Sequence, residues 1–295
     1  MIKSLCFVLI NLFYVCNAQQ QRNLFSEIVK SRCIQWTIEH KILDVNCDEM
    51  WHLFESVLLS AHQNSSCIMP PELYDSFVQK AFEKQPPVKD PHFYSQVFGT
   101  IRAMCKRLGV CSSLETTLPG YLFDELNWCM KNFTGNASYG TPCGCNETSK
   151  VVLAFWESAS AMYAKKVSGD VIVVLNGSVA LPLRENGTFV RVEFPLLVPP
   201  RVRKITVKLI HNARRTNYHH TCESLSIRQF ASIVKSRSIS YECINDPPEF
   251  KHFLCIEDPY ISDCQFSSSS IAKYVNNSLF FAFLLFYSVV HFFII

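Results

Sequence analysis

Acidic and aromatic side chains are the residues best suited to chemistry in this 295-residue chain. Glu115 and Asp124 lie nine positions apart, and Glu193 lies in a β-rich run. Taken alone, these three acids would be a helix-start acid, a surface acid and an edge-strand acid that faces water. Trp156, on a predicted helix, would by itself be a core residue. The sequence has no Gly-x-Ser-x-Gly motif, which disfavours a serine hydrolase.

Cysteine chemistry is the second question, because the chain has 14 cysteines. Cys6 and Cys16 lie in a predicted signal peptide, and 14 minus these two leaves 12 in the mature chain. An even number in a secreted chain argues for six disulfides. Only Cys143 and Cys145 approach the spacing of a zinc site, without a Cys-x-x-Cys pair or a histidine at partner distance, so we expect no metal.

Both ends of the chain resemble targeting signals. Residues 1–18 contain a basic residue and an apolar stretch too short for a membrane span, and they close on Ala18, which predicts a secretory signal peptide. Residues 279–295 are an apolar tail, preceded by a spacer and by four serines at 267–270. This pattern predicts that 267–295 is a GPI-attachment signal, and hence a protein at the outer face of the plasma membrane. The alternative, a C-terminal span, lacks a following Lys or Arg.

Composition fits an extracellular protein and offers no case for nucleic-acid binding. The formal net charge is only +3. The denser basic region at 201–215 alternates with apolar residues, which predicts a half-buried strand with a solvated outer face. The alternative is that these basic residues bind the phosphates of a substrate. Association of two copies is left open. The Asn-x-Ser/Thr motifs predict glycosylation of the mature chain at Asn64, Asn132, Asn136, Asn146, Asn176 and Asn186.

Hydrophobic spacing indicates a helical first half and a mixed second half. Helical periodicity predicts helices around residues 24–29, 51–58, 149–167 and 227–234. Short β-rich runs predict strands over residues 170–175, 189–194 and 205–210. Strands that alternate with helices suggest a small α/β sheet beside a helical domain, and a cleft between the two is a usual place for a small-molecule site.

Residues 113–129 carry a resemblance to a known family. Their sequence, SLETTLPGYLFDELNWC, resembles the signature T-L-E-D-T-L-x-G-Y-L-x-D-x-L-x-W-C of the ADP-ribosyl cyclase/NAD glycohydrolase family. The segments at 155–156, 175–178 and 187–193 follow in the family's order and spacing, so the match covers roughly residues 33–264. The nearest kind of member is a hydrolytic, NAD(P)-catabolising ectoenzyme.

The resemblance implies an α+β or α/β fold in two parts. A helical N-terminal domain, residues 19–87 and 113–167, would pack on a smaller α/β domain, residues 88–112 and 168–266. The smaller domain would hold a short parallel sheet, and the active-site cleft would lie between the domains. The family's disulfides would be Cys33–Cys47, Cys67–Cys145, Cys129–Cys143, Cys222–Cys243 and Cys255–Cys264, with Cys105–Cys111 as an addition.

The resemblance also implies catalytic roles. Glu193 matches the family's catalytic glutamate, which would hold the ribose hydroxyls and stabilise the ribosyl cation left when nicotinamide departs. Trp156 matches an active-site tryptophan that packs on the nicotinamide or ribose and limits the access of water. Ser160 and Thr188 match positions that hydrogen-bond the ribose and the phosphates.

Two acids would bind the nicotinamide group. Glu115 matches the acid that binds the carboxamide, and Asp124 the acid that orients it; two close carboxylates also raise each other's pKa. The chain departs from the family at Tyr94, where a second tryptophan is usual, and at Gln96, where a phosphate-binding arginine is common. Both departures concern the substrate-binding wall.

The function that the resemblance implies is an extracellular NAD(P) glycohydrolase. It would release nicotinamide and ADP-ribose, with little cyclic ADP-ribose, and NAD and NADP would be substrates while no cofactor is expected. A catalytically silent receptor or adhesion module on the same fold is the alternative. The presence together of Glu193, Trp156 and Glu115 favours the enzyme.

Overall fold

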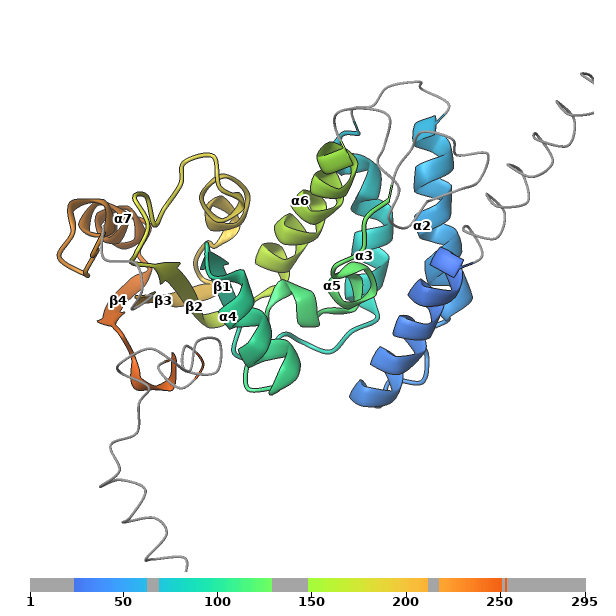
Figure 1. Ribbon diagram of the computed structural model, residues 1–295, viewed down its shortest axis with the longest axis horizontal. Helices are drawn as coiled ribbons and strands as arrows, with labels where there is room; N and C mark the ends of the chain where they lie inside the picture. Colours follow the sequence, from blue (N-terminus) through green and yellow to red (C-terminus); the bar gives the residue numbers. More distant parts are fainter. Residues whose placement is uncertain (1–23, 63–68, 129–147, 212–217, 251–252, 254–295) are drawn as a thin grey trace, which may run out of the picture.

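The computed structural model describes residues 24–62, 69–128, 148–211, 218–250 and 253. A bundle of helices forms one side of the molecule and a parallel sheet the other (Figure 1). Apolar side chains from both sides form a continuous hydrophobic core. None of the helices in this described part is long and apolar enough to cross a bilayer.

Apolar residues at helical spacing form the helices that the sequence predicts. In the first helix, over residues 24–40, Phe25 and Val29 lie one turn apart and both are buried. The other predicted helices are α2 (Cys47–His62), α6 (Thr148–Lys166) and α7 (Leu225–Ser236). Three helices that the sequence did not predict are α3 (Asp75–Glu83), α4 (Phe98–Arg102) and α5 (Leu118–Phe123). Tighter or wider turns are η1 (Pro71–Tyr74), η2 (Ala103–Arg107), η3 (Leu114–Thr116), η4 (Phe189–Glu193) and η5 (Phe194–Leu196).

Stacked and edge-on aromatic rings hold the helical side together. The Phe54 and Phe123 ring centroids are 4.1 Å apart, and those of Phe123 and Phe155 are 4.9 Å apart. The Trp128 indole N–H donates to the Tyr74 hydroxyl at 3.0 Å, so the polar atoms inside this cluster are paired. Phe155 joins α6, which faces the sheet, to this rigid cluster.

Four parallel strands form the sheet, in the order β1-β2-β3-β4. The predicted strands at 170–175 and 205–210 are confirmed. Helices or turns precede and follow them, so both faces of β2 are covered and its apolar run is continuous. The strand bounds are β1 (His92–Ser95), β2 (Gly169–Asn176), β3 (Val202–Ile210) and β4 (Ser240–Asn245).

The strand predicted over residues 189–194 is wrong. The segment forms the wide helical turn η4 and the start of η5, in which the Arg191 amide donates to the Gly187 carbonyl at 2.9 Å. Phe189 and Glu193, four positions apart, are buried, whereas Arg191 between them is exposed. The alternation of apolar and polar residues that suggests a strand is therefore also compatible with one face of a helical turn.

Three of the expected disulfides join described residues, and each has the predicted pairing. The predicted signal peptide and anchor signal, the other three expected disulfides and the sequons at Asn64, Asn132, Asn136 and Asn146 lie outside the described residues. The disulfides in the described part are Cys33–Cys47, Cys105–Cys111 and Cys222–Cys243.

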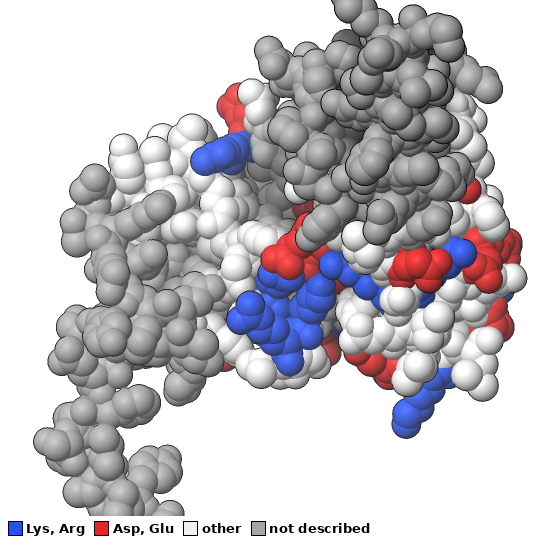
Figure 2. All heavy atoms as spheres, turned by 45° about the vertical axis from the view of Figure 1, so that its right-hand side comes forward, with Lys and Arg blue, Asp and Glu red and all other residues white. Residues whose placement is uncertain are grey.

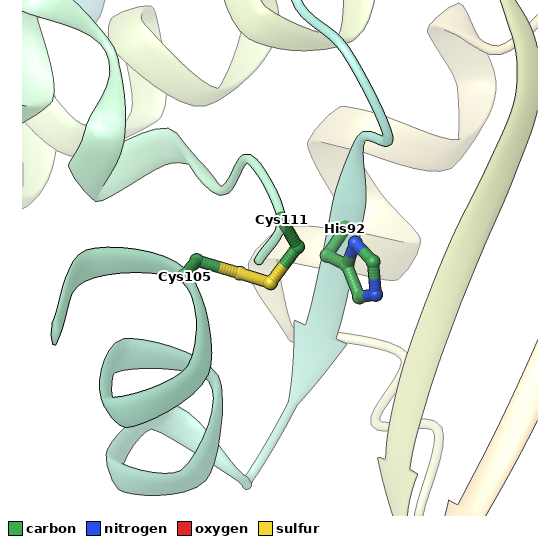
Figure 3. A group of neighbouring side chains, drawn as sticks. All are labelled: His92, Cys105 and Cys111. Carbon is green, nitrogen blue, oxygen red and sulfur yellow. A yellow bond between two sulfur atoms is a disulfide. The ribbon is translucent and has the colours of Figure 1, made fainter. Parts of the chain in front are cut away.

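His92 lies beside the disulfide of Cys105 and Cys111 (Figure 3). Among the described residues this is the one group of three side chains close enough to share a metal ion, but the two sulfurs are bonded to each other and are not thiolate ligands. Burial lowers the pKa of His92, and one ring nitrogen lies 2.8 Å from the Asp90 carbonyl oxygen. We interpret this group as a disulfide packed on a neutral imidazole.

Candidate active site

A cavity of about 490 Å³ lies between α6 and the carboxyl end of β1. This volume suits a small-molecule ligand, and the carboxyl ends of parallel strands are the usual place for one. All seven residues that the resemblance selects line it, although they come from five different segments of the chain. These residues are Tyr94, Glu115, Asp124, Trp156, Ser160, Thr188 and Glu193.

Glu193 lies at the end of η4 and is only 8% exposed. It does not face water from a strand edge, as its sequence context alone would suggest. Burial raises the pKa of Glu193 to about 8, and the charge of Glu115 adds to this effect, whereas a hydrogen bond with Ser160 opposes it. The protonated carboxyl group is therefore favoured up to mildly alkaline pH.

Two arginines fasten the Glu193 segment to α6. Arg191 makes a bidentate pair with Glu157, with N–O distances of 2.6 and 2.8 Å. Arg201 donates to the carbonyl oxygens of Ala164 and Val167, at 2.7 and 2.6 Å, and to that of Leu196. These contacts fix η4 and η5 against the helix that carries the opposite wall of the cavity.

α6 supplies that wall through one helical face. Trp156 is half-buried, and Ser160 lies one turn further along the helix. Phe155, the neighbour of Trp156, points instead into the aromatic core, where it packs on Phe123. The indole of Trp156 therefore rests on a rigid support, with its ring centroid 5.2 Å from that of Phe155.

Glu115 is held in the turn η3, where only 3% of it is exposed. The Tyr94 hydroxyl donates to one carboxylate oxygen and the Ser113 hydroxyl to the other, the latter at 2.7 Å. Burial raises the pKa of Glu115, and the hydrogen bonds oppose this effect. Gly120 lets α5 approach this turn, since a Cβ there would lie 2.0 Å from the Leu114 carbonyl oxygen.

Asp124 follows α5 and is 1% exposed. Unlike Glu193 and Glu115, it has cationic partners: Arg102 donates to it at 3.1 Å, and Lys106 donates to the same oxygen. Both cations come from the segment after β1, on α4 and η2. The cavity therefore holds three buried acids, of which one is neutralised by ion pairs.

The cavity also contains residues that the sequence did not single out. Tyr163 lies three positions after Ser160 on the same helical face, and its hydroxyl donates to the Ser112 carbonyl at 2.9 Å. Helical spacing from Trp156 could have identified it. Arg184 is a further addition, and no sequence pattern distinguishes it from other loop arginines. Ser113, which is fully buried, does not line the cavity and acts on it only through its hydrogen bond to Glu115.

Two of the predicted glycosylation sites lie in the described part of the chain, close to this cavity. Asn186 is exposed, between two cavity-lining residues. Asn176 is half-buried at the end of β2, where its amide donates to the Gln96 carbonyl at 3.2 Å and accepts from the Ser178 amide at 2.9 Å. Glycosylation at either asparagine stays a prediction.

Surface charges of both signs lie near one another on the face that Figure 2 presents. Figure 2 shows lysine and arginine side chains next to acidic ones over the face that it presents. Exposed ion pairs such as Lys204 with Glu242, at 2.6 Å, are part of this pattern.

Comparisons with known proteins agree with the fold. The sequence profile of the ADP-ribosyl cyclase family matches residues 22–264. The chain is 27% identical over 248 residues to ADP-ribosyl cyclase/cyclic ADP-ribose hydrolase 1 of Mus musculus, covering 83% of this chain and 80% of the relative. It is 26% identical to the corresponding protein of Aplysia kurodai, covering 75% of this chain and 77% of that one.

Solved structures are similar over the same region. Aplysia cyclase, crystallised with the substrate NGD and the product cGDPR, has a TM-score of 0.69 at 22% identity, covering 82% of this chain and 97% of that one. Porcine CD38, in complex with the covalent intermediate ribo-F-ribose-5′-phosphate, has a TM-score of 0.60 at 25% identity, covering 75% of this chain and 95% of that one.

The raised pKa of Glu193 predicts a specific pH dependence of stability. Because folding raises this pKa from 4.5 to about 8, the protonated form favours the folded state, and that stabilisation is complete below the unfolded pKa and lost as pH rises toward about 8. Glu193→Gln should therefore gain stability relative to the natural protein between about pH 5 and pH 8. Urea unfolding across this range measures the difference.

The control is Glu242→Gln, which removes an exposed acid paired with Lys204. It should not reproduce the trend, because its ion pair lowers the pKa of Glu242. A stability difference between Glu193→Gln and the natural protein that is constant with pH would contradict the prediction.

Proposed function

The chain belongs to the ADP-ribosyl cyclase family, and on that premise we propose that it is an extracellular enzyme that hydrolyses NAD and NADP to nicotinamide and the corresponding ADP-ribose. In this reaction the bond between the ribose C1′ and the pyridinium nitrogen breaks, and its electron pair leaves with neutral nicotinamide. Water then adds to C1′ and loses a proton. The protein must stabilise the cationic ribosyl group between these events.

The buried carboxyl group of Glu193 is the observation that carries this proposal. This carboxyl group lies in the same cavity as the Trp156 indole, and it is hydrogen-bonded to the Ser160 side chain. The cationic pyridinium ring of NAD would favour ionisation of Glu193 when it enters, since a nearby positive charge lowers the pKa of an acid. The resulting carboxylate would face the cation in a site from which an aromatic wall excludes water.

The two other acids suit the nicotinamide end. Burial raises the pKa of Glu115, which favours a protonated form that can donate to the carboxamide oxygen. Asp124, held by Arg102 and Lys106, would accept from the carboxamide nitrogen. Because these contacts involve only the nicotinamide end, we expect NAD and NADP to be used alike, as substrates, and no cofactor to be required.

Hydrolysis is expected to exceed cyclisation. Cyclisation requires the adenine to fold back onto the ribosyl cation before water arrives, which aromatic walls would assist. Glu115 matches the acid that is associated with hydrolysis in the family. In this protein the Tyr94 hydroxyl donates a hydrogen bond to Glu115. The names of the relatives include both cyclase and hydrolase activities, so the product ratio is the quantity to measure.

A silent receptor on the same fold is the competing function. A binding module has no need of a buried acid of raised pKa that faces a tryptophan in a cavity, so the site favours the enzyme. Absence of any nicotinamide release from NAD by the purified natural protein would favour the receptor.

Replacing Glu193 with Gln should reduce the rate of NAD cleavage by at least about 100-fold, because a neutral amide stabilises the ribosyl cation much less than a carboxylate. Nicotinamide and ADP-ribose would be quantified by chromatography. Glu242→Gln, a surface change, should retain the natural rate. A folded Glu193→Gln protein with natural turnover would end the mechanistic proposal.

Replacing Tyr94 with Trp should increase the cyclic share of the product, since a larger ring would stack better on a folded intermediate. Tyr94→Phe is the matched control, because it removes the hydrogen bond to Glu115 and keeps the ring size. The assay is the ratio of cyclic to linear product from NAD, or fluorescence from a guanine analogue that reports ring closure. Predominantly cyclic product from the natural protein would refute the expected preference for hydrolysis.

The proposed location is the cell surface, through a GPI anchor. The apolar C-terminal tail, the predicted signal peptide and the three disulfides support it. A phosphatidylinositol-specific phospholipase should release the activity from intact cells that express the chain. Activity that remains in the membrane fraction would point instead to a C-terminal span.

A further inference from the structure

Arg184 is the one lysine or arginine among the described residues that line the cavity. It is exposed, whereas Glu115, Asp124 and Glu193 are at most 8% exposed, so the cation lies at the mouth and these three acids form the floor. A fourth lining acid, Glu125, is exposed and pairs with Arg102. Arg102 and Lys106 are nearby in the fold, but Lys106 is paired with Asp124, and Arg102 with both Asp124 and Glu125. Within the described part of the chain, no ion pair joins the Arg184 guanidinium to an acid, so none of the acids that line the cavity neutralises it.

The loop that carries Arg184 is held at the mouth by specific contacts. The side-chain amide of Gln96 donates to the Leu181 carbonyl at 2.6 Å, which joins this loop to the end of β1. The Gly187 amide donates to the Arg184 carbonyl at 2.9 Å and closes a turn just before Thr188. A charged side chain and a hydroxyl, four positions apart, are thereby presented on the same rim of the cavity.

The proposed substrate requires a cation at this place. When its nicotinamide ribose occupies the acidic floor, its pyrophosphate, with two negative charges, must extend toward the mouth. The acids repel it there, and Gln96, which also lines the cavity, offers no charge. A guanidinium matches phosphate oxygens in both geometry and charge.

We propose that Arg184 recognises the pyrophosphate of the dinucleotide and so supplies, from the loop after β2, a positive charge at the mouth of the cavity. The inference rests on the proposed function, because it takes the nicotinamide ribose to bind beside Glu193. Arg184 contacts no reacting atom. Its effect is on the binding of substrate and product rather than on bond cleavage.

Arg184→Gln tests the proposal. Loss of one charge-assisted hydrogen bond at this exposed position should raise the KM for NAD and the Kd for ADP-ribose by about tenfold or more. The kcat should stay within about twofold of the natural value. Inhibition by free nicotinamide, which has no phosphate, should be unchanged. Arg184→Lys, which keeps the charge, should retain most of the affinity.

The matched control is Arg203→Gln. Arg203 is an exposed arginine near the start of β3, paired with Asp170 at 3.3 Å, at the sheet edge opposite the carboxyl ends of the strands. It should change neither KM nor Kd. Equal weakening by both Gln variants, equal weakening by Arg184→Lys and Arg184→Gln, or an unchanged Kd for ADP-ribose in Arg184→Gln would overturn the inference.

The two proposals fail separately. If the natural protein cleaves NAD and Arg184→Gln binds ADP-ribose as well as it does, the function stands and the role of Arg184 is rejected. If the natural protein releases no nicotinamide, the function is rejected, and titration calorimetry of ADP-ribose with the same variants still decides whether Arg184 binds a pyrophosphate.

Discussion

Removal of the Glu193 carboxyl group from water is the constraint on which the rest of the site depends. An isolated buried carboxylate is costly, so the group must be protonated, hydrogen-bonded or opposed by a positive charge. The protein itself provides the first two, through a raised pKa and the hydrogen bond with Ser160. A cationic substrate would supply the third, so burial both disfavours the charge in the empty protein and strengthens its interaction with a ribosyl cation.

Contacts with rigid elements hold Glu193 in its buried position. Glu193 is carried by a short wide turn, which by itself would have little stability. The pair of Arg191 with Glu157, and the bonds of Arg201 to the end of α6, fix the turn to a long helix. That helix is in turn seated on the aromatic cluster through Phe155. The distance between Glu193 and the opposite wall is therefore set by packing in the helical side of the molecule.

Charge is distributed unevenly from the floor of the cavity to its mouth. The floor has three acids, and the two cations close to it are paired with Asp124. Arg184, which no acid among the described residues pairs with, lies at the exposed mouth. This polarity matches a ligand that is positive at one end and negative further along, as a pyridinium dinucleotide is. It also accounts for the role of residues 113–128: their acids line the floor while Leu118, Leu122, Phe123 and Trp128 fill the core.

Local sequence determined the elements that follow a regular pattern of burial along the chain. The run at 170–175 is apolar because both faces of β2 are covered, and the helical spacing around α6 and α7 gives each one buried face. β1 and β4 were missed, because β1 is only four residues long and β4 is largely polar. The resemblance identified the seven cavity residues and the disulfide pairing. The local sequence pattern alone would have placed Glu193 at a solvent-facing strand edge.

Only the tertiary structure decided what residues 189–194 become. Their apolar and polar residues fit one face of a strand or of a helical turn, and local preference does not discriminate between them. Burial of Phe189 against Phe93 and Phe230, and the pairing of Arg191 with α6, select the turn. That selection also buries Glu193 and brings Arg184 to the cavity mouth. Neither outcome is encoded at short range, because both depend on contacts between residues far apart in the chain.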